Sequence, residues 1–111
     1  MFVRWKRRQL RRSRDTAHYA VLVHGVWVHG TVRQRVVRYL GAIREQYRTT
    51  PAHRAWFWTC VEQRLAPLGL DPAMRQAVEI RLAQVVPRPT AVELQEVATQ
   101  RATLARWAEE T

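Results

Sequence analysis

The chain has 111 residues, the length of one ordinary domain. Hydrophobic residues make up 47 % of it, which excludes a disordered tail, because disorder combines high charge with low hydrophobicity. The single cysteine, Cys60, excludes an internal disulfide framework, and the formal net charge of +10 points to an anionic partner. No apolar run reaches the length of a membrane span and no secretory signal follows the N-terminus, so we expect a cytoplasmic protein without a membrane partner.

The net charge is confined to the first part of the chain. Residues 1–48 hold 12 basic and two acidic residues, whereas residues 49–111 hold seven of each. A genome that favours arginine codons would explain arginine in place of lysine, but it would not explain a neutral second half. The asymmetry therefore predicts an electropositive end that meets a polyanion such as nucleic acid.

Residues 1–14 carry seven positive charges and no negative charge. Because such a density of like charge disfavours a free helix, we expect a basic arm that becomes ordered on phosphate. Trp5 would then stack on a base or dock on the body of the protein. A mitochondrial presequence has a similar composition, but this segment continues directly into a predicted strand.

Residues 15–48 predict an antiparallel β-hairpin followed by a short helical turn. The segments 18–28 and 32–39 are rich in β-branched and aromatic residues, and His29-Gly30-Thr31 between them is a turn signal. Strict alternation would place Arg33 and Arg35 on one face and Arg38 on the other. A two-stranded hairpin is marginally stable alone, so it must pack on helices or join another sheet.

Residues 49–111 predict three helices that pack with the hairpin as one domain of the α+β class. Thr50-Pro51 and Asp71-Pro72 each combine an N-cap with proline at the first helical position, and Thr90 with Glu93 forms a capping box. The helices are expected over residues 51–66, 72–85 and 91–108.

Three consecutive aromatic residues occupy the first of these helices. Trp56 and Phe57 follow the helical spacing of the expected buried stripe, together with Val61 and Leu65. Trp58 falls off this stripe. We therefore expect Trp56 in the core. For Trp58 we favour packing in the core or against the hairpin over contact with a partner chain or a stacked base.

The sequence predicts neither an enzyme nor a cofactor or metal site. Acidic residues are scarce and the glycines are dispersed, so neither a carboxylate-held metal centre nor a phosphate loop is evident. Cys60 lies on the expected buried stripe without an activating neighbour. The other candidate metal ligands, which do not follow the spacing of zinc sites, are His18, His24, His29 and His53.

Residues 19–46 resemble the N-terminal segment of DDE-type insertion-sequence transposases. In that family a basic stretch and a first strand precede a turn and the pattern VRQRTVxYLGxI, and here Val32-Arg33-Gln34-Arg35-Val36-Val37-Arg38-Tyr39-Leu40-Gly41-Ala42-Ile43 matches it with Val36 in place of Thr. The resemblance implies a DNA-binding segment related to mobile elements. The chain departs from the family after residue 48, where nothing resembles the catalytic carboxylate triad.

We therefore predict a non-catalytic nucleic-acid-binding protein, with DNA favoured over RNA. The first alternative is an RNA-binding accessory of a ribonucleoprotein. The second is a protein–protein adaptor or homodimer, in which Trp58, Trp107 and the edge of the hairpin form the contact surface and the charge serves solubility only. Trp5, Tyr39 and Trp58 are candidates for stacking or partner contact. The candidate nucleic-acid-binding residues are Arg4, Lys6, Arg7, Arg8, Arg11, Arg12, Arg14, Arg33, Gln34, Arg35 and Arg38.

Overall fold

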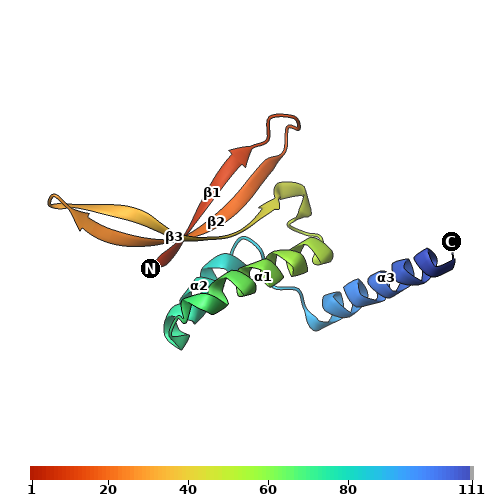
Figure 1. The fold of residues 1–111 in the computed structure, drawn as a ribbon. Coiled ribbons are helices and arrows are strands. Elements are labelled where there is room, and N and C mark those ends of the chain that lie inside the picture. The colour runs from red at the N-terminus through yellow and green to blue at the C-terminus, as the bar shows by residue number, and fades with distance from the viewer. Residues whose placement is uncertain (111) are drawn as a thin grey trace.

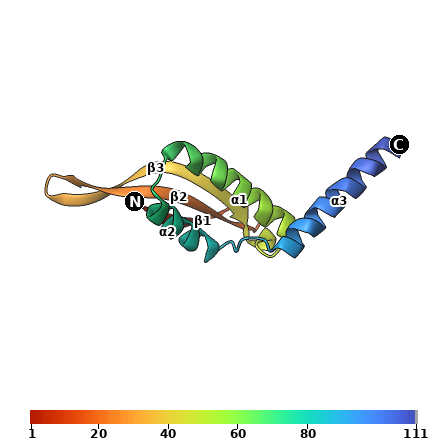
Figure 2. The same ribbon diagram turned by 90° about the horizontal axis from the view of Figure 1, so that it is seen from below.

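The computed structural model describes residues 1–110, which fold as an antiparallel sheet followed by helices (Figure 1). The strands lie in the order β1-β2-β3, and α1 and α2 cover one face of the sheet (Figure 2). The α+β class is as predicted. The elements are β1 (Phe2–Gln9), β2 (Thr16–Val28), β3 (Thr31–Arg44), the 3₁₀ turns η1 (Glu45–Tyr47) and η2 (Ala66–Leu68), and the helices α1 (Pro51–Leu65), α2 (Pro72–Ala83) and α3 (Ala91–Glu110).

The N-terminal residues form a strand rather than the expected arm. β1 pairs antiparallel with β2 from Phe2 opposite Val23 to Gln9 opposite Thr16. Alternation along the strand turns Val3 and Trp5 toward the helices, where both pack in the core. The prediction was wrong because it weighed the total charge of the segment and not its period of two, which separates these apolar side chains from half of the basic ones.

The hairpin between β2 and β3 is confirmed, and β1 supplies the third strand that a stable sheet needs. The turn has positive φ at His29 (50°) and Gly30 (76°), as in the type I′ turns of two-residue hairpin loops. Register shifts occur between Ala20 and Val21 and between Leu22 and Val23. Such bulges bend the strand that carries the extra residue, here β3.

All three helices begin at the predicted residues, and their ends differ from the prediction by one or two positions. The Asp71 side chain accepts a hydrogen bond of 2.9 Å from the Met74 N–H. At α3 the capping box is reciprocal: the Glu93 N–H donates to Thr90 Oγ1 and the Thr90 N–H donates to the Glu93 carboxylate, each at 3.1 Å. Local capping chemistry therefore sets the starts of α2 and α3, whereas the Thr50 side chain forms no capping hydrogen bond at the start of α1.

The core lies between the sheet and the helices α1 and α2. Phe57 is the largest of its fully buried side chains, and the Phe57 ring stacks on Trp5 at a centroid distance of 5.9 Å. A methyl group at Gly41 would lie 3.1 Å from Phe57, so this glycine allows β3 to approach α1 closely. The other core residues are Val3, Ala20, Leu22, Leu40, Ile43, Trp58, Val61, Leu65, Val78, Leu82 and Val86.

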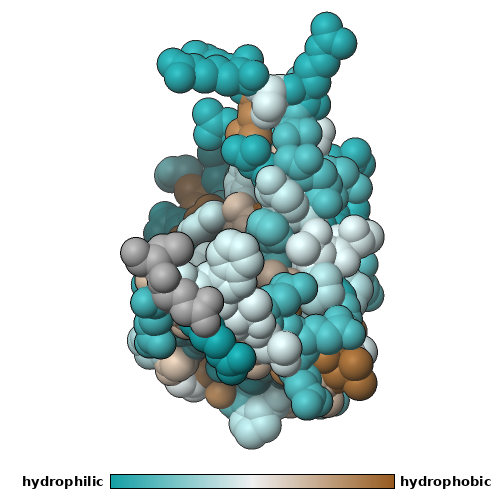
Figure 3. Space-filling model, turned by 90° about the vertical axis from the view of Figure 1, so that its right-hand side faces the viewer, coloured by the Kyte–Doolittle hydropathy of each residue, from teal (hydrophilic) through white to brown (hydrophobic). Residues whose placement is uncertain are grey.

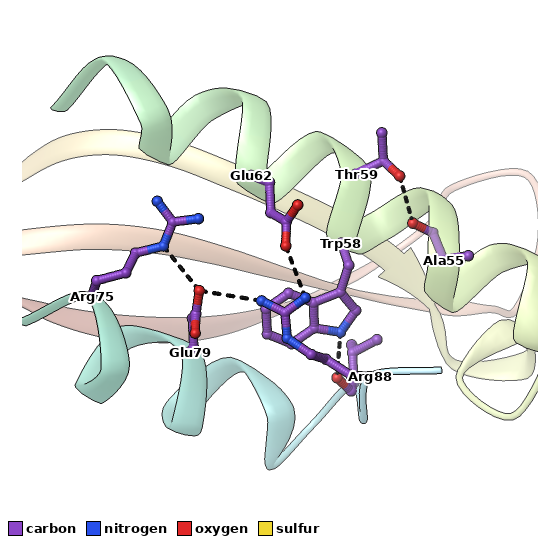
Figure 4. Close-up of polar contacts among 8 residues, drawn as sticks. Ala55, Trp58, Thr59, Glu62, Arg75, Glu79 and Arg88 are labelled. Carbon is purple, nitrogen blue, oxygen red and sulfur yellow. Dashed lines mark hydrogen bonds and ion pairs between the residues drawn. The ribbon is translucent and has the colours of Figure 1, made fainter. Parts of the chain in front are cut away.

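The buried face of α1 includes Phe57, Val61 and Leu65 as predicted, but it holds Trp58 in place of Trp56. Trp56 is 61 % exposed, so its predicted burial was wrong, whereas Trp58 is 3 % exposed and packs in the core, which is one of the two favoured alternatives. The segment after α2 causes the difference, because it folds back over α1. Trp58 Nε1 donates a hydrogen bond of 2.9 Å to the Val86 carbonyl, and the Arg88 guanidinium lies 3.9 Å from the Trp58 ring centroid (Figure 4).

The described chain is extended, with dimensions of 65 × 37 × 22 Å. Its radius of gyration is 17.2 Å, whereas a compact chain of this length has a value of about 13 Å. Figure 1 shows the cause: the outer part of the β2–β3 hairpin projects at one end, and α3 projects at the other.

Candidate nucleic-acid interface

The outer part of the β2–β3 hairpin forms a free two-stranded ribbon, which we define as residues 24–38. It extends beyond the ends of the helices that cover the rest of the sheet (Figure 2). No side chain between His24 and Tyr39 is buried. The ribbon is therefore accessible from both faces and around its tip.

One face of the ribbon is cationic. In the register, Arg38 lies opposite Leu22, Arg35 opposite His24 and Arg33 opposite Val26. Because alternate residues of β2 share a face, their three arginine partners share it as well. The prediction that Arg38 lies on the other face was wrong. β3 has one extra residue opposite the step from Leu22 to Val23, so from that point its side chains point to the faces opposite to those that strict alternation gives.

These arginines are also free of acidic partners. No ion pair within residues 1–110 involves Arg33, Arg35 or Arg38, and all three are exposed. By contrast, Arg54 contacts Glu93, and Arg88 contacts both Glu62 and Glu79 (Figure 4). Three carboxylates of the helical half thus pair with arginines of that half and not with those of the ribbon.

The predicted basic residues of β1 divide between its two faces. By alternation Arg4, Lys6 and Arg8 lie on the face away from the helices, and Arg7 lies on the helix side opposite His18. Arg4 Nη1 donates a hydrogen bond of 2.9 Å to Gln34 Oε1. Gln34 therefore links the base of the ribbon to β1 and lies on the face opposite the three ribbon arginines.

A second cationic group lies in the turn between β1 and β2. Figure 3 shows hydrophilic side chains of this turn projecting from the top of the molecule. The 13 residues of β2 span about 40 Å, so this turn and the ribbon tip lie at opposite ends of the sheet. The predicted binding residues therefore form separate groups and not one patch. The basic residues of the turn are Arg11, Arg12 and Arg14.

The predicted stacking candidates have different environments. Trp5 is docked on the body, where its Nε1 donates to the Arg81 carbonyl at 3.4 Å, so the docking alternative is the one observed. Tyr39 is 44 % exposed, with the Arg64 guanidinium 5.0 Å from its ring centroid. Trp58 is buried in the core, as described above.

Sequence reasoning missed Trp27. This side chain is 76 % exposed and lies opposite Val32, close to the ribbon tip. It occupies the face of the ribbon opposite the arginines. The one signal in the sequence was its position two residues before the predicted turn, and its exposure follows from the projection of the ribbon beyond the helices.

A cleft beside η1 combines acidic and basic groups. Among the residues that line it are Arg7, His18, Glu45 and Arg48. The hydrogen bond from His18, followed by that from Arg48, lowers the pKa of Glu45 below its ordinary value. The Glu45 carboxylate contacts both His18 and Arg48, which leaves the cleft less positive than its arginines suggest.

Comparison with protein-family models, curated proteins and solved structures found no match. Among residues 1–110, no helix is both long and apolar enough to cross a bilayer. In the same part of the chain, His, Cys, Asp and Glu side chains do not gather in groups of three or more that could hold a metal ion.

Proposed function

We propose that this protein binds nucleic acid, DNA in preference to RNA, and acts as a binding module without catalytic chemistry. The observation that carries this proposal is the projecting ribbon, which holds three arginines on one face with no carboxylate partner in the described part of the chain. Exposed arginines of this kind form charge-assisted, bidentate hydrogen bonds with phosphate oxygens.

The shape of the ribbon fits duplex DNA. The major groove is about 12 Å wide and admits a two-stranded β-ribbon, whose strands lie about 4.8 Å apart. In this arrangement Arg33 and Arg35 contact phosphates or base edges, and the turn that holds Arg11, Arg12 and Arg14 adds phosphate contacts at the other end of the sheet. The resemblance of residues 19–46 to a transposase DNA-binding segment supports the same function.

The proposal is tested by binding of the full chain to a labelled DNA duplex, followed by fluorescence anisotropy. The double variant R33A/R35A removes two charges from the ribbon, and R101A/R106A removes the same charge from exposed positions on α3. We expect the ribbon variant to lose about tenfold or more in affinity, because each specific arginine contact contributes about 1–3 kcal/mol. The α3 variant should stay close to the wild type.

Competition experiments distinguish the alternative ligands. Unlabelled duplex should displace the labelled DNA at lower concentration than structured RNA or heparin. RNA that competes better than duplex would favour the ribonucleoprotein alternative. Equal losses in the two double variants would show that binding reflects total charge, and would contradict a specific role for the ribbon.

A protein–protein role is the second candidate, and α3 is the observation that favours it. Val92 and Leu104 on this projecting helix are 67 % and 70 % exposed. Sedimentation of the wild type and of Leu104→Glu tests this role: a concentration-dependent oligomer that this change dissolves, in a chain without duplex binding, would favour the adaptor function.

A further inference from the structure

Trp27 and Val32 form an apolar pair at the end of the ribbon. They lie directly opposite each other in the register, on either side of the turn, and are 76 % and 54 % exposed. Trp27 is the most exposed large hydrophobic side chain of the described chain. No ring contact or side-chain hydrogen bond within residues 1–110 engages its indole.

The surroundings of this pair indicate what contacts it. Val26, the residue before Trp27, lies opposite Arg33, and two residues further from the tip His24 lies opposite Arg35. An apolar protein surface that covered Trp27 and Val32 would also have to approach these unpaired arginines, and removing their charges from water is unfavourable. A nucleic acid instead offers phosphates that bind the arginines and flat aromatic bases that stack on the indole. One ligand can therefore contact both faces of the ribbon.

We propose that Trp27, supported by Val32, stacks on a base of the bound nucleic acid while Arg33 and Arg35 hold the flanking phosphates. This inference rests on the function proposed above. A ribbon that enters a groove tip first carries the residues beside the turn deepest, and the arginines then lie along the wall of the groove.

Stacking requires a base that has left its neighbours, and opening a paired step has an energetic cost. That cost is lowest where a base is already unpaired or mismatched. The ligand class that follows is DNA with an unpaired base or an easily opened step, in preference to a fully paired, uniform duplex.

The test uses two duplexes of the same flanking sequence, one fully paired and one with a single bulged 2-aminopurine. The proteins are the full chain, Trp27→Ala, Trp27→Phe and the control Trp56→Ala, which removes an equally large exposed indole from α1. Anisotropy gives the affinity and 2-aminopurine fluorescence reports stacking. Circular dichroism confirms that each variant is folded.

We expect the wild type to prefer the bulged duplex and to quench 2-aminopurine. Trp27→Ala should lose about 5- to 100-fold in affinity for the bulged duplex and lose the quenching, with little change on the paired duplex. Trp27→Phe should keep part of both effects, and Trp56→Ala should match the wild type.

Other outcomes would overturn the inference. If Trp27→Ala binds and quenches the bulged duplex like the wild type, the stacking role is wrong while the proposed function stands. The same conclusion follows if Trp56→Ala loses as much as Trp27→Ala. If the wild type binds neither duplex, the proposed function itself fails.

Discussion

Aromatic side chains of α1 determine how the helix packs on the sheet. Phe57 lies between Trp5 of β1, which stacks on it, and Trp58, whose ring meets it edge to face at a centroid distance of 6.0 Å. Trp56, which directly precedes Phe57 in the sequence, lies on another side of the helix and faces solvent. Burial of the Phe57 ring therefore stabilises the fold, whereas the neighbouring Trp56 contributes little to the free energy of folding.

The first prediction compares these neighbours. Phe57→Ala should lower the free energy of unfolding by about 3–5 kcal/mol, because it removes a fully buried ring and leaves a cavity. Trp56→Ala should lower it by less than about 1 kcal/mol, as is usual for an exposed position. Denaturant unfolding measures both values, and similar losses in the two variants would contradict the packing described here.

The second prediction concerns Glu93, which joins α3 to α1. Its hydrogen bond with the Thr90 backbone, together with the Arg54 guanidinium, lowers the pKa of Glu93 below its ordinary value of 4.5. A lowered pKa stabilises the folded state above pH 4.5, and this contribution is lost as the pH falls through the folded value. Protonation also leaves Arg54, which is 8 % exposed, without its counter-ion.

Amide hydrogen exchange of the first turns of α3 should therefore accelerate as the pH falls below about 4.5, after correction for the intrinsic exchange rate. Glu93→Gln should exchange fast at every pH and lose this dependence. Glu96→Gln is the matched control, since Glu96 is exposed and forms no ion pair within the described chain, and it should retain the dependence. A Glu93→Gln profile identical to that of the wild type would contradict the anchoring role.

At the level of elements, the bend of β3 decides which side chains form the interface. The extra residue of β3 at the first register shift leaves both Leu40 and Gly41 near the helices. The extra residue at the second shift places Arg38 on the same face as Arg33. Without these bulges the arginines would divide between the two faces of the ribbon. The close approach at Gly41 keeps the inner end of β3 against α1.

The third prediction tests the close contact between β3 and α1 at Gly41. Gly41→Val should lower the free energy of unfolding by about 1–3 kcal/mol, because its side chain would meet the Phe57 ring, which is held by Trp5 and Trp58. Gly25→Val is the control on the open ribbon, where a methyl group meets Val32 only at 3.4 Å. If Gly41→Val leaves the free energy of unfolding unchanged, or if Gly25→Val lowers it by the same amount, the close contact between Gly41 and Phe57 is not required for packing.

The features that could be predicted from the sequence are those that depend on neighbouring residues. Asp71, Thr90 and Glu93 mark helix starts because capping is a contact across three residues. The pairing of β1, the bulges of β3 and the fold of the Val86 segment over Trp58 depend on distant parts of the chain. Arg33 and Arg35 were therefore identified, but the face of Arg38 and the exposure of Trp27 were not.

At the scale of the whole molecule, the arginines of the ribbon and those of the turn between β1 and β2 occupy the two ends of an extended sheet. Because residues 2–9 are a strand, deletion of the first 14 residues would remove one edge of the sheet along with its charge. Changing Arg11, Arg12 and Arg14 together to Ala removes charge from the turn and leaves β1 in place. This variant should weaken binding to all duplexes to a similar extent, as expected for phosphate contacts, and filter binding on several sequences measures it.

The salt dependence of duplex binding tests the central role of the ribbon most directly. The logarithm of the wild-type affinity should fall steeply with the logarithm of salt concentration, with a slope of about −0.9 for each phosphate neutralised. R33A/R35A should flatten this slope by as much as about two and change the ranking of duplex sequences, while R101A/R106A keeps both. A wild-type affinity that does not depend on salt, or a slope and ranking that R33A/R35A leaves unchanged, would contradict DNA binding through the ribbon.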